Sequence, residues 1–421
     1  MEESEPSVRY SVQTLNRVTL DYEPCCLEFW DTTHFVVGYY HLDKQDEDNE
    51  EHGKAQVRSG AIDIMKIIGS EGDIQYLERV AFNTSSVLDL HFQESSNRVE
   101  GSDPILVAAL STGSLVSYKL RQTTKSSTET RFQEQTFHQV APPTILVTAF
   151  QFHTDPNIIC AALSTGEIIL CVLDLSSPAI SPESEPRSVD YRDTEKLMTI
   201  CNHDLEAWYV VPSIDGISVL SGGDDATFRV SDCSGFLAAH SDGDKFSVGA
   251  PVQRVDRRIH QAGVTVIYPL SKSIMLTGSY DDHIRAVSVP SVGRPTVLTE
   301  LDLGGGVWRL QELSRTQHRP MDASNDRVSW VVLVSCMYAG VRVVEIKLEN
   351  DIWSIDVLAR FEEHKSMNYA SAAIPSADGH LWKEEGGAEF VSTSFYDKLL
   401  CVWRTGPQDG NRCATISATG T

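Results

Sequence analysis

Residues Val219–Asp232 read VLSGGDDATFRVSD, and residues Met275–Val289 read MLTGSYDDHIRAVSV. Each stretch consists of an apolar run, a few small residues, a turn that contains aspartate, and a second run rich in β-branched residues. Short runs of this composition, separated by Gly and Asp, are typical of two strands joined by a tight turn. Each stretch is therefore predicted to form a β-hairpin.

The same pattern recurs along the chain. Its other copies are Phe390–Arg404, Leu106–Leu120, Ile159–Leu173, Leu333–Ile346 and, in the most degenerate form, His34–Leu42 continued at Gly60–Ile67. Helix-period patterns are almost absent, and seven repeated hairpins match the blades of a β-propeller. The sequence therefore predicts an all-β, seven-bladed propeller of the WD-repeat type, formed as a single domain by residues 1–421.

The sequence also predicts how the ring closes and how its blades are locked. The last copy ends near Arg404, so the run Arg9–Leu15 is expected to supply the outer strand of the last blade, which removes an exposed sheet edge. In WD repeats, a histidine ahead of the hairpin forms a buried hydrogen-bonded pair with the turn aspartate. The expected pairs are His203 with Asp225, His260 with Asp281, and His364 with Asp397.

Polar inserts interrupt the repeats. Residues 43–58, 121–130 and 176–187 are rich in Ser, Glu, Lys and Asp, so they cannot pack into a core and are expected to be mobile loops. Residues 405–421 are expected to form a C-terminal tail.

Composition limits the ligands and the cellular location that are expected for the protein. The 35 basic and 59 acidic residues give a net charge of -24, which repels phosphate backbones, so nucleic acid is not an expected ligand. The charge either favours basic partners or only keeps the protein soluble. No apolar run approaches the roughly 20 residues that a membrane span needs, and the start MEESEPS does not resemble a secretory signal.

The nine cysteines include no Cys-x-x-Cys pair and lie mostly in apolar runs. This distribution favours buried thiols in a reducing compartment over disulfides or a metal site. A cytoplasmic location is therefore expected.

Large aromatic side chains mark the predicted inner strands. Trp208 and Tyr369 occupy the same register after His203 and His364, and Trp308 occupies it in the sixth blade. Inner strands run close to the axis and usually carry small residues there. The three rings therefore predict a rim that grips a side chain or a peptide, with the packing of a wide channel as an equal alternative.

Polar residues beyond the locking pairs are candidates for catalysis. Three of them lie next to or near the turn aspartates: Asp224 directly before Asp225, His283 two residues after Asp281, and Tyr396 directly before Asp397. A carboxylate or an imidazole in such a place can act as a general base for water, although turns are often polar for solubility alone. The sequence contains no Gly-x-Ser-x-Gly, His-Glu-x-x-His, P-loop or Gly-x-Gly-x-x-Gly motif.

Several strings are more specific than a WD-repeat pattern. They are HDLEAWYVV (His203–Val211), SGGDDA (Ser221–Ala226), GSYDDHIR (Gly278–Arg285), GGGVWRL (Gly304–Leu310) and STSFYDKLLCVWR (Ser392–Arg404). Together they resemble the WD-repeat diphthine methyl ester hydrolase family of diphthamide biosynthesis. The resemblance covers Cys201–Arg404, and only the blade rhythm supports it in the first half. The chain departs from the pattern where Val-Ser-Asp and Val-Ser-Val replace the usual Trp-Asp at two blade ends.

The resemblance implies hydrolysis of the methyl ester of methylated diphthine on translation elongation factor 2, without a cofactor or a metal. Trp208, Trp308, Tyr369 and Tyr396 are then expected to bind the trimethylammonium group of the substrate. The candidate catalytic residues are Asp224, Glu206, His283, His203 if the blade lock leaves it free, and Arg309 as the partner of the oxyanion or carboxylate. The alternative is a non-catalytic scaffold that binds proteins.

Overall fold

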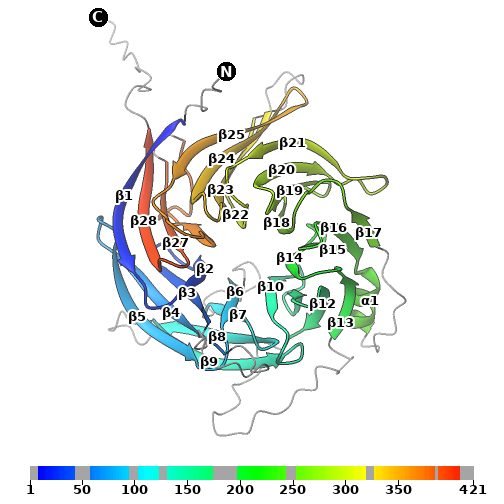
Figure 1. The fold of residues 1–421 in the computed structure, drawn as a ribbon, viewed down its shortest axis with the longest axis horizontal. Coiled ribbons are helices and arrows are strands. Elements are labelled where there is room, and N and C mark those ends of the chain that lie inside the picture. Colours follow the sequence, from blue (N-terminus) through cyan, green and yellow to red (C-terminus); the bar gives the residue numbers. More distant parts are fainter. Residues whose placement is uncertain are drawn as a thin grey trace, which may run out of the picture.

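Every predicted hairpin forms the middle of a four-stranded antiparallel sheet in the computed structural model, which describes residues 8–42, 57–93, 103–122, 130–173, 197–242, 253–318, 327–384 and 387–407. Seven such sheets surround a central axis as the blades of a propeller (Figure 1). The prediction of an all-β, seven-bladed propeller is thereby confirmed.

The first four blades each run from the inner to the outer strand in chain order. Blade 1 consists of β2 (Pro24–Phe29), β3 (His34–Leu42), β4 (Arg58–Ile68) and β5 (Asp73–Phe82). Blade 2 consists of β6 (Val87–Phe92), β7 (Ile105–Leu110), β8 (Ser114–Gln122) and β9 (Thr130–Gln139). Blade 3 consists of β10 (Val147–Phe152), β11 (Ile158–Leu163), β12 (Glu167–Val172) and β13 (Leu197–Asn202). Blade 4 consists of β14 (Ala207–Pro212), β15 (Ser218–Gly223), β16 (Phe228–Asp232) and β17 (Gln253–Asp256), with α1 (Ser234–Asp242) before its outer strand.

The last three blades complete the ring. Blade 5 consists of β18 (Val264–Pro269), β19 (Ile274–Ser279), β20 (His283–Ser288) and β21 (Thr296–Asp302). Blade 6 consists of β22 (Arg309–His318), β23 (Arg327–Ser335), β24 (Val341–Glu349) and β25 (Ile352–Phe361). Blade 7 consists of β26 (Ala370–Ala373), β27 (Glu389–Ser394), β28 (Leu399–Pro407) and β1 (Tyr10–Thr19).

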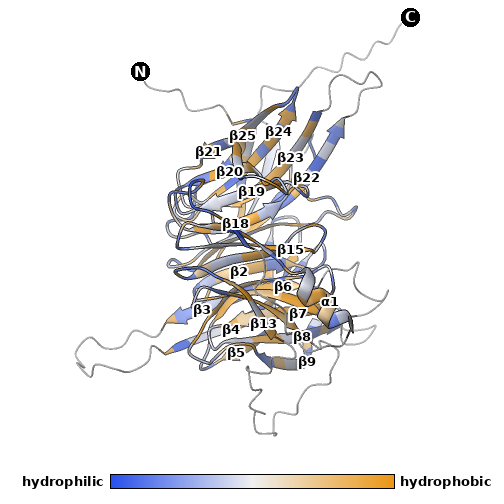
Figure 2. Ribbon diagram, turned by 90° about the vertical axis from the view of Figure 1, so that its right-hand side faces the viewer, coloured by the Kyte–Doolittle hydropathy of each residue, from blue (hydrophilic) through white to orange (hydrophobic). Residues whose placement is uncertain are grey.

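Small residues in the hairpin motif allow neighbouring blades to approach each other closely. A methyl group added at Gly222 would lie 2.6 Å from Val264 of the next blade, and one added at Gly278 would collide with Val307. Apolar side chains fill the space between the sheets, so both faces of a blade are buried. Figure 2 shows hydrophobic residues concentrated along the strands in the body of the ring. The small-residue stretch of the repeat is thus a packing requirement.

The N-terminal strand closes the ring as predicted. β1 pairs with β28 from Tyr10 opposite Pro407 to Thr19 opposite Leu399, and the two lie side by side in Figure 1. This strand is longer than the predicted run 9–15. It also keeps residues 405–407 within β28, so the prediction that the tail begins at residue 405 is wrong, because their backbone is paired with the N-terminal strand.

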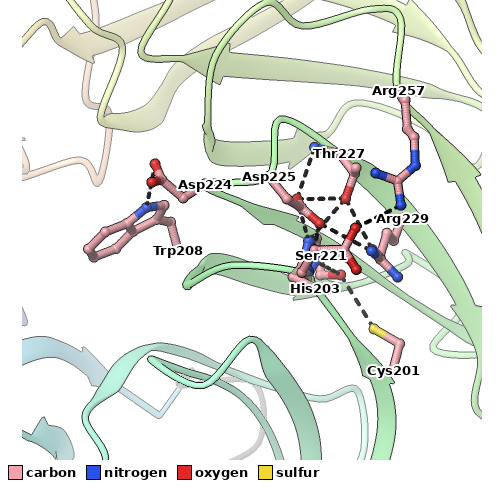
Figure 3. Close-up of polar contacts among 10 residues, drawn as sticks. Cys201, His203, Trp208, Ser221, Asp224, Asp225, Thr227, Arg229 and Arg257 are labelled. Carbon is pink, nitrogen blue, oxygen red and sulfur yellow. Dashed lines mark hydrogen bonds and ion pairs between the residues drawn. The ribbon is translucent and has the colours of Figure 1, made fainter.

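One predicted locking pair is present in full. His203 and Asp225 form a hydrogen bond of 2.9 Å, and the second ring nitrogen of His203 bonds the hydroxyl of Ser221 at 2.9 Å (Figure 3). Arg229 adds a salt bridge of 3.1 Å to Asp225. Burial alone would raise the pKa of the Asp225 carboxyl, but hydrogen bonds from His203, the amide of Asp204 and the hydroxyl of Thr227 hold it well below its usual range. The network ties the entry of blade 4 to the turn between β15 and β16.

The other two predicted pairs are wrong. His260 bonds the hydroxyl of Thr277 at 2.9 Å, while Arg285 occupies the carboxylate of Asp281 at 2.8 Å. His364 bonds Ser392 at 2.7 Å, and Asp397 instead accepts a hydrogen bond of 2.6 Å from the hydroxyl of Ser366.

The consequence is that neither histidine is hydrogen-bonded to a carboxylate among the described residues. Within the described part of the chain, Nδ1 of His260 and Nδ1 of His364 have no hydrogen-bond partner. Burial lowers the pKa of each ring to about 4, so both are neutral at physiological pH.

Most of the predicted mobile loops lie outside the described residues. This holds for 43–56, 123–129, 176–187 and the tail beyond Pro407. The remaining ends of the predicted loops belong to strands, since β4 begins at Arg58, β8 ends at Gln122 and β9 begins at Thr130. Among the described helices, none has the length and apolar character required to cross a membrane.

Candidate functional site

Four aromatic rings converge where the inner strands of blades 4 to 7 begin. Trp208 belongs to β14, Trp308 and Tyr369 directly precede β22 and β26, and Tyr280 lies in the turn after β19. The ring centroids of Trp308 lie 5.8 Å from Trp208, 6.0 Å from Tyr280 and 5.0 Å from Tyr369. We call these four residues the aromatic mouth. The structure thus brings together the three rings that were predicted from the sequence. It adds Tyr280, which lies in the string GSYDDHIR but was not predicted as a site residue.

The line of rings continues outward through the last blade. Tyr369 contacts Phe395 at 5.4 Å between centroids, and Phe395 contacts Tyr396 at 5.0 Å. Tyr396 is 68 % exposed. The structure therefore places Tyr396 at the outer end of this line, one ring away from the aromatic mouth.

A carboxylate lies at the edge of the aromatic mouth. Nε1 of Trp208 donates a hydrogen bond of 3.3 Å to Oδ1 of Asp224 (Figure 3). A methyl group added at Gly263 would lie 2.8 Å from both this oxygen and the ring of Tyr280, so Asp224 lies near both rings. Asp224 is exposed to solvent. The arrangement sets one negative charge beside the packed rings, and a carboxylate beside aromatic rings suits a cation.

Among the described residues, no hydrogen bond or ion pair joins the side chains of the other predicted acids and bases to the rings. The main chain of Glu206 accepts a hydrogen bond of 2.8 Å from the amide of Asp224, but its exposed side chain makes no recorded contact with the described rings. His283 bonds the carbonyl of Asp281 at 2.6 Å. The ring of His203 is fully buried and both of its nitrogens are bonded, so His203 belongs to the blade lock and is not available as a base.

Arg309 connects the aromatic mouth to the channel. Its guanidinium carbon lies 4.9 Å from the ring centroid of Trp308 and 5.5 Å from that of Tyr209. Nη1 donates a hydrogen bond of 3.0 Å to the carbonyl of Trp308, and Nη2 lies 3.8 Å from a carboxylate oxygen of Asp89. Arg309 is therefore the predicted cation that the structure places beside the rings.

A group of polar residues on the inner strands was not predicted from the sequence. We call Glu28, Asp89, His91 and Gln151 the channel cluster. His91 contacts Glu28 at 2.9 Å, Gln151 at 2.9 Å and Asp89 at 3.4 Å. The signal was the inner strand VLDLHF (Val87–Phe92), which carries an acid and a histidine at alternate positions of an otherwise apolar run.

The channel cluster has a defined charge distribution. Burial alone would lower the pKa of His91, but the carboxylates of Asp89 and Glu28 raise it to about 10, so the imidazole is cationic. Burial would raise the pKa of Asp89, but His91 and Arg309 lower it below its usual range. Asp89 is thus a buried carboxylate between two cations.

A cavity of about 370 Å³ is lined by three residues of the channel cluster, by Arg309 and by one ring of the aromatic mouth. Its lining comes from β2, β6, β22 and β26 and includes Glu28, Asp89, His91, Arg309 and Tyr369. Tyr369 belongs to both the cavity and the aromatic mouth, so a ligand held by the rings would have access to Arg309.

Relatives cover nearly the whole chain. A protein of Saccharomyces cerevisiae is 26 % identical over 92 % of this chain and 97 % of its own length, and its name is Diphthine methyltransferase. This chain is similar to the diphthine methyltransferases. A Dictyostelium discoideum protein named Diphthine methyltransferase homolog is 24 % identical over 92 % of this chain and 98 % of its own length. The Schizosaccharomyces pombe Diphthine methyltransferase is 28 % identical over 63 % of this chain and 66 % of its own length.

Solved structures agree on the fold. A chain of the mitotic checkpoint complex superposes with a TM-score of 0.55 at 13 % identity, covering 96 % of both chains. The WD40 propeller domain of Doa1 superposes with a TM-score of 0.54 at 10 % identity, covering 93 % of this chain and 96 % of that domain. No family model matches the chain. At these identities the likeness shows the WD40 propeller fold alone.

Proposed function

We propose that this protein is an enzyme of diphthamide biosynthesis that hydrolyses the methyl ester of methylated diphthine on translation elongation factor 2. Relatives aligned over nearly the whole chain have names that refer to diphthine. The single observation that carries the proposal is the aromatic mouth with Asp224 at its edge. Ring faces beside a carboxylate suit a quaternary ammonium group, and the substrate carries a trimethylammonium group.

Hydrolysis and the methyl transfer in the relatives' names break different bonds. In hydrolysis, the oxygen of water bonds to the acyl carbon, the bond from that carbon to the methoxy oxygen breaks, and the methoxy group leaves as methanol after it takes a proton. Negative charge then develops on the former carbonyl oxygen. N–H donors beside the cation site support hydrolysis because they stabilise this charge, and Arg309 lies next to Trp308.

The residues divide the task in the proposed reaction. The aromatic mouth holds the trimethylammonium group, and Arg309 donates hydrogen bonds to the developing oxyanion. Asp224 accepts a proton from the attacking water, since its Oδ2 has no recorded partner among the described residues. Glu206, which is also exposed and whose main-chain carbonyl accepts a hydrogen bond from the amide of Asp224, is the alternative base, and His283 ranks below both because its ring is bonded to the carbonyl of Asp281.

The face around the aromatic mouth offers further contacts for a protein substrate. Tyr396 and Tyr338 are 68 % and 55 % exposed and lie in turns of blades 7 and 6. Exposed tyrosines are common at protein interfaces because they combine a large apolar ring with a hydrogen-bonding group. We expect them to contact elongation factor 2 around the modified histidine.

The first test uses elongation factor 2 that carries methylated diphthine, incubated with the purified full-length protein alone and followed by intact mass. The proposal predicts loss of the mass of one methylene group together with released methanol. An unchanged mass with stable binding would support the scaffold alternative. A gain of mass that requires an added methyl donor would instead support a methyltransferase.

A further inference from the structure

The aromatic mouth and Arg309 are parts of one continuous surface. Trp308 contributes its ring to the mouth and its carbonyl to Nη1 of Arg309. Tyr369 contacts Trp308 and also lines the cavity that contains Arg309. A site for a cation and a positively charged side chain therefore lie next to each other, which suits a ligand that carries both signs of charge.

The guanidinium of Arg309 has hydrogen-bond donors left for a ligand. Among the described residues, its recorded hydrogen bond goes to the carbonyl of Trp308, and its contact with Asp89 at 3.8 Å is too long for a hydrogen bond. An arginine has five N–H donors in a fixed fork that matches a carboxyl group. The side chain is 19 % exposed, so a ligand in the cavity can reach it.

The channel cluster orients this fork and does not compete for the ligand. Nδ1 of His91 is bonded to the carboxylate of Glu28 at 2.9 Å, and its Nε2 lies 3.4 Å from the carboxylate of Asp89. Asp89 accepts a hydrogen bond of 3.1 Å from the amide of Phe150 and attracts Arg309 from one side. Arg309 is thus the cation lining the cavity that has donors left for a ligand, and because its guanidinium lies 4.9 Å from the ring centroid of Trp308, a quaternary ammonium group binds at the ring surfaces that Arg309 leaves free.

We propose that the aromatic mouth and Arg309 form one site for a betaine-type group, in which a quaternary ammonium and a carboxyl group share a short linker. The rings bind the ammonium, and the fork of Arg309 binds the carboxyl oxygens. The choice of ligand class rests on the proposed function. The inference goes beyond it because an ionised carboxylate makes stronger hydrogen bonds to arginine than a neutral ester does. The site therefore binds the free betaine more tightly than its ester and retains the demethylated product.

Glycine betaine is the smallest probe that carries both groups. Tetramethylammonium, acetate and the methyl ester of glycine betaine are the matched probes for the cation alone, the carboxylate alone and the neutral ester. Each is titrated into the full-length protein, and binding is followed by tryptophan fluorescence and by ligand-observed NMR. We expect glycine betaine to bind more tightly than any of the three.

Arg309→Gln identifies the residue responsible. This substitution is expected to weaken the binding of glycine betaine about tenfold, which corresponds to the loss of one hydrogen bond to a charged group. The binding of tetramethylammonium is not expected to weaken. Arg315→Gln is the control, because Arg315 lies on the same strand with its guanidinium 5.7 Å from the ring of Trp330 but does not line the cavity. Arg309→Lys, which keeps the charge without the fork, is expected to fall between the wild type and Arg309→Gln, and thermal unfolding verifies that each variant is folded.

The inference is overturned if glycine betaine binds no more tightly than tetramethylammonium or its own ester, or if Arg309→Gln weakens both probes equally. Ester turnover is measured in parallel on modified elongation factor 2. Selective binding of glycine betaine without ester turnover supports the betaine site and contradicts the proposed hydrolase activity. Ester turnover without selective binding of glycine betaine contradicts the betaine site and supports the proposed hydrolase activity.

Discussion

Replacing Trp308 with alanine removes the central ring of the aromatic mouth. The ring contacts Trp208, Tyr280 and Tyr369 at centroid distances of 5.0 to 6.0 Å, so its loss opens one side of the cation site. The hydrogen bond of Arg309 remains, because it goes to the main-chain carbonyl of residue 308, but the ring that lies 4.9 Å from its guanidinium is lost. One well-placed ring contributes about 0.5–2 kcal/mol to the binding of a quaternary ammonium group. This corresponds to a loss of about 2- to 30-fold in kcat/KM.

The loss should appear in KM, because the cation is bound equally in the ground state and in the transition state. Steady-state turnover of methylated elongation factor 2 measures it, and Trp308→Phe should lose less because a ring remains. Trp353→Ala is the matched control, since Trp353 stacks on Trp330 at 5.8 Å in the same blade but outside the aromatic mouth. If Trp308→Ala and Trp353→Ala turn over the substrate with the same kcat/KM, the cation site has been wrongly placed.

Adjacent aspartates are expected to separate catalysis from stability. Asp224→Asn should lower kcat/KM by about 100-fold with unchanged urea unfolding, because it removes an exposed base but keeps the acceptor for Trp208; equal turnover would exclude Asp224 as the base. Asp225→Asn should lower the free energy of unfolding by about 3 kcal/mol in urea, because it removes the partner of a buried ion pair; a wild-type unfolding midpoint would contradict the blade lock. The buried rings of His260 and His364 have pKa values of about 4 in the folded protein, against an ordinary value of 6.5. As pH drops below 6.5, these histidines are therefore protonated in the unfolded chain before they are protonated in the folded protein. The free energy of unfolding should fall between pH 6.5 and pH 4 by about 3 kcal/mol for each ring. Urea unfolding across this range measures the slope, which should flatten in a variant with glutamine at both positions, and a slope that stays the same would refute the assignment.

The fold could be predicted from sequence because the repeat encodes local and packing requirements together. The apolar run, the small residues and the turn aspartate of Val219–Asp232 correspond to β15, the close approach of blade 5 at Gly222, and the turn held by Asp225. Ring closure followed from counting strands, since the last hairpin needs one more partner. These features depend on residues that are close to one another in the chain, so the sequence pattern of the repeat is enough to predict them.

The site could be predicted only in part, because its contacts join distant blades. The common register of the inner strands indicated Trp208, Trp308 and Tyr369, but no spacing revealed that Arg309 faces Asp89, which is more than two hundred residues earlier in the chain. The channel cluster was hidden for the same reason. The pairs expected for His260 and His364 failed because Arg285 and Ser366 compete for the turn aspartates, and sequence spacing cannot rank such competitors.

The most direct test of the proposed reaction traces the oxygen of water. Methylated elongation factor 2 is incubated with the purified protein in water enriched in the heavy oxygen isotope, and both products are analysed by mass spectrometry. Hydrolysis at the acyl carbon predicts that the heavy isotope enters the carboxyl group of the product and that the released methanol is unlabelled. Labelled methanol, or demethylation without isotope in the carboxyl group, would contradict the hydrolysis mechanism proposed for this site.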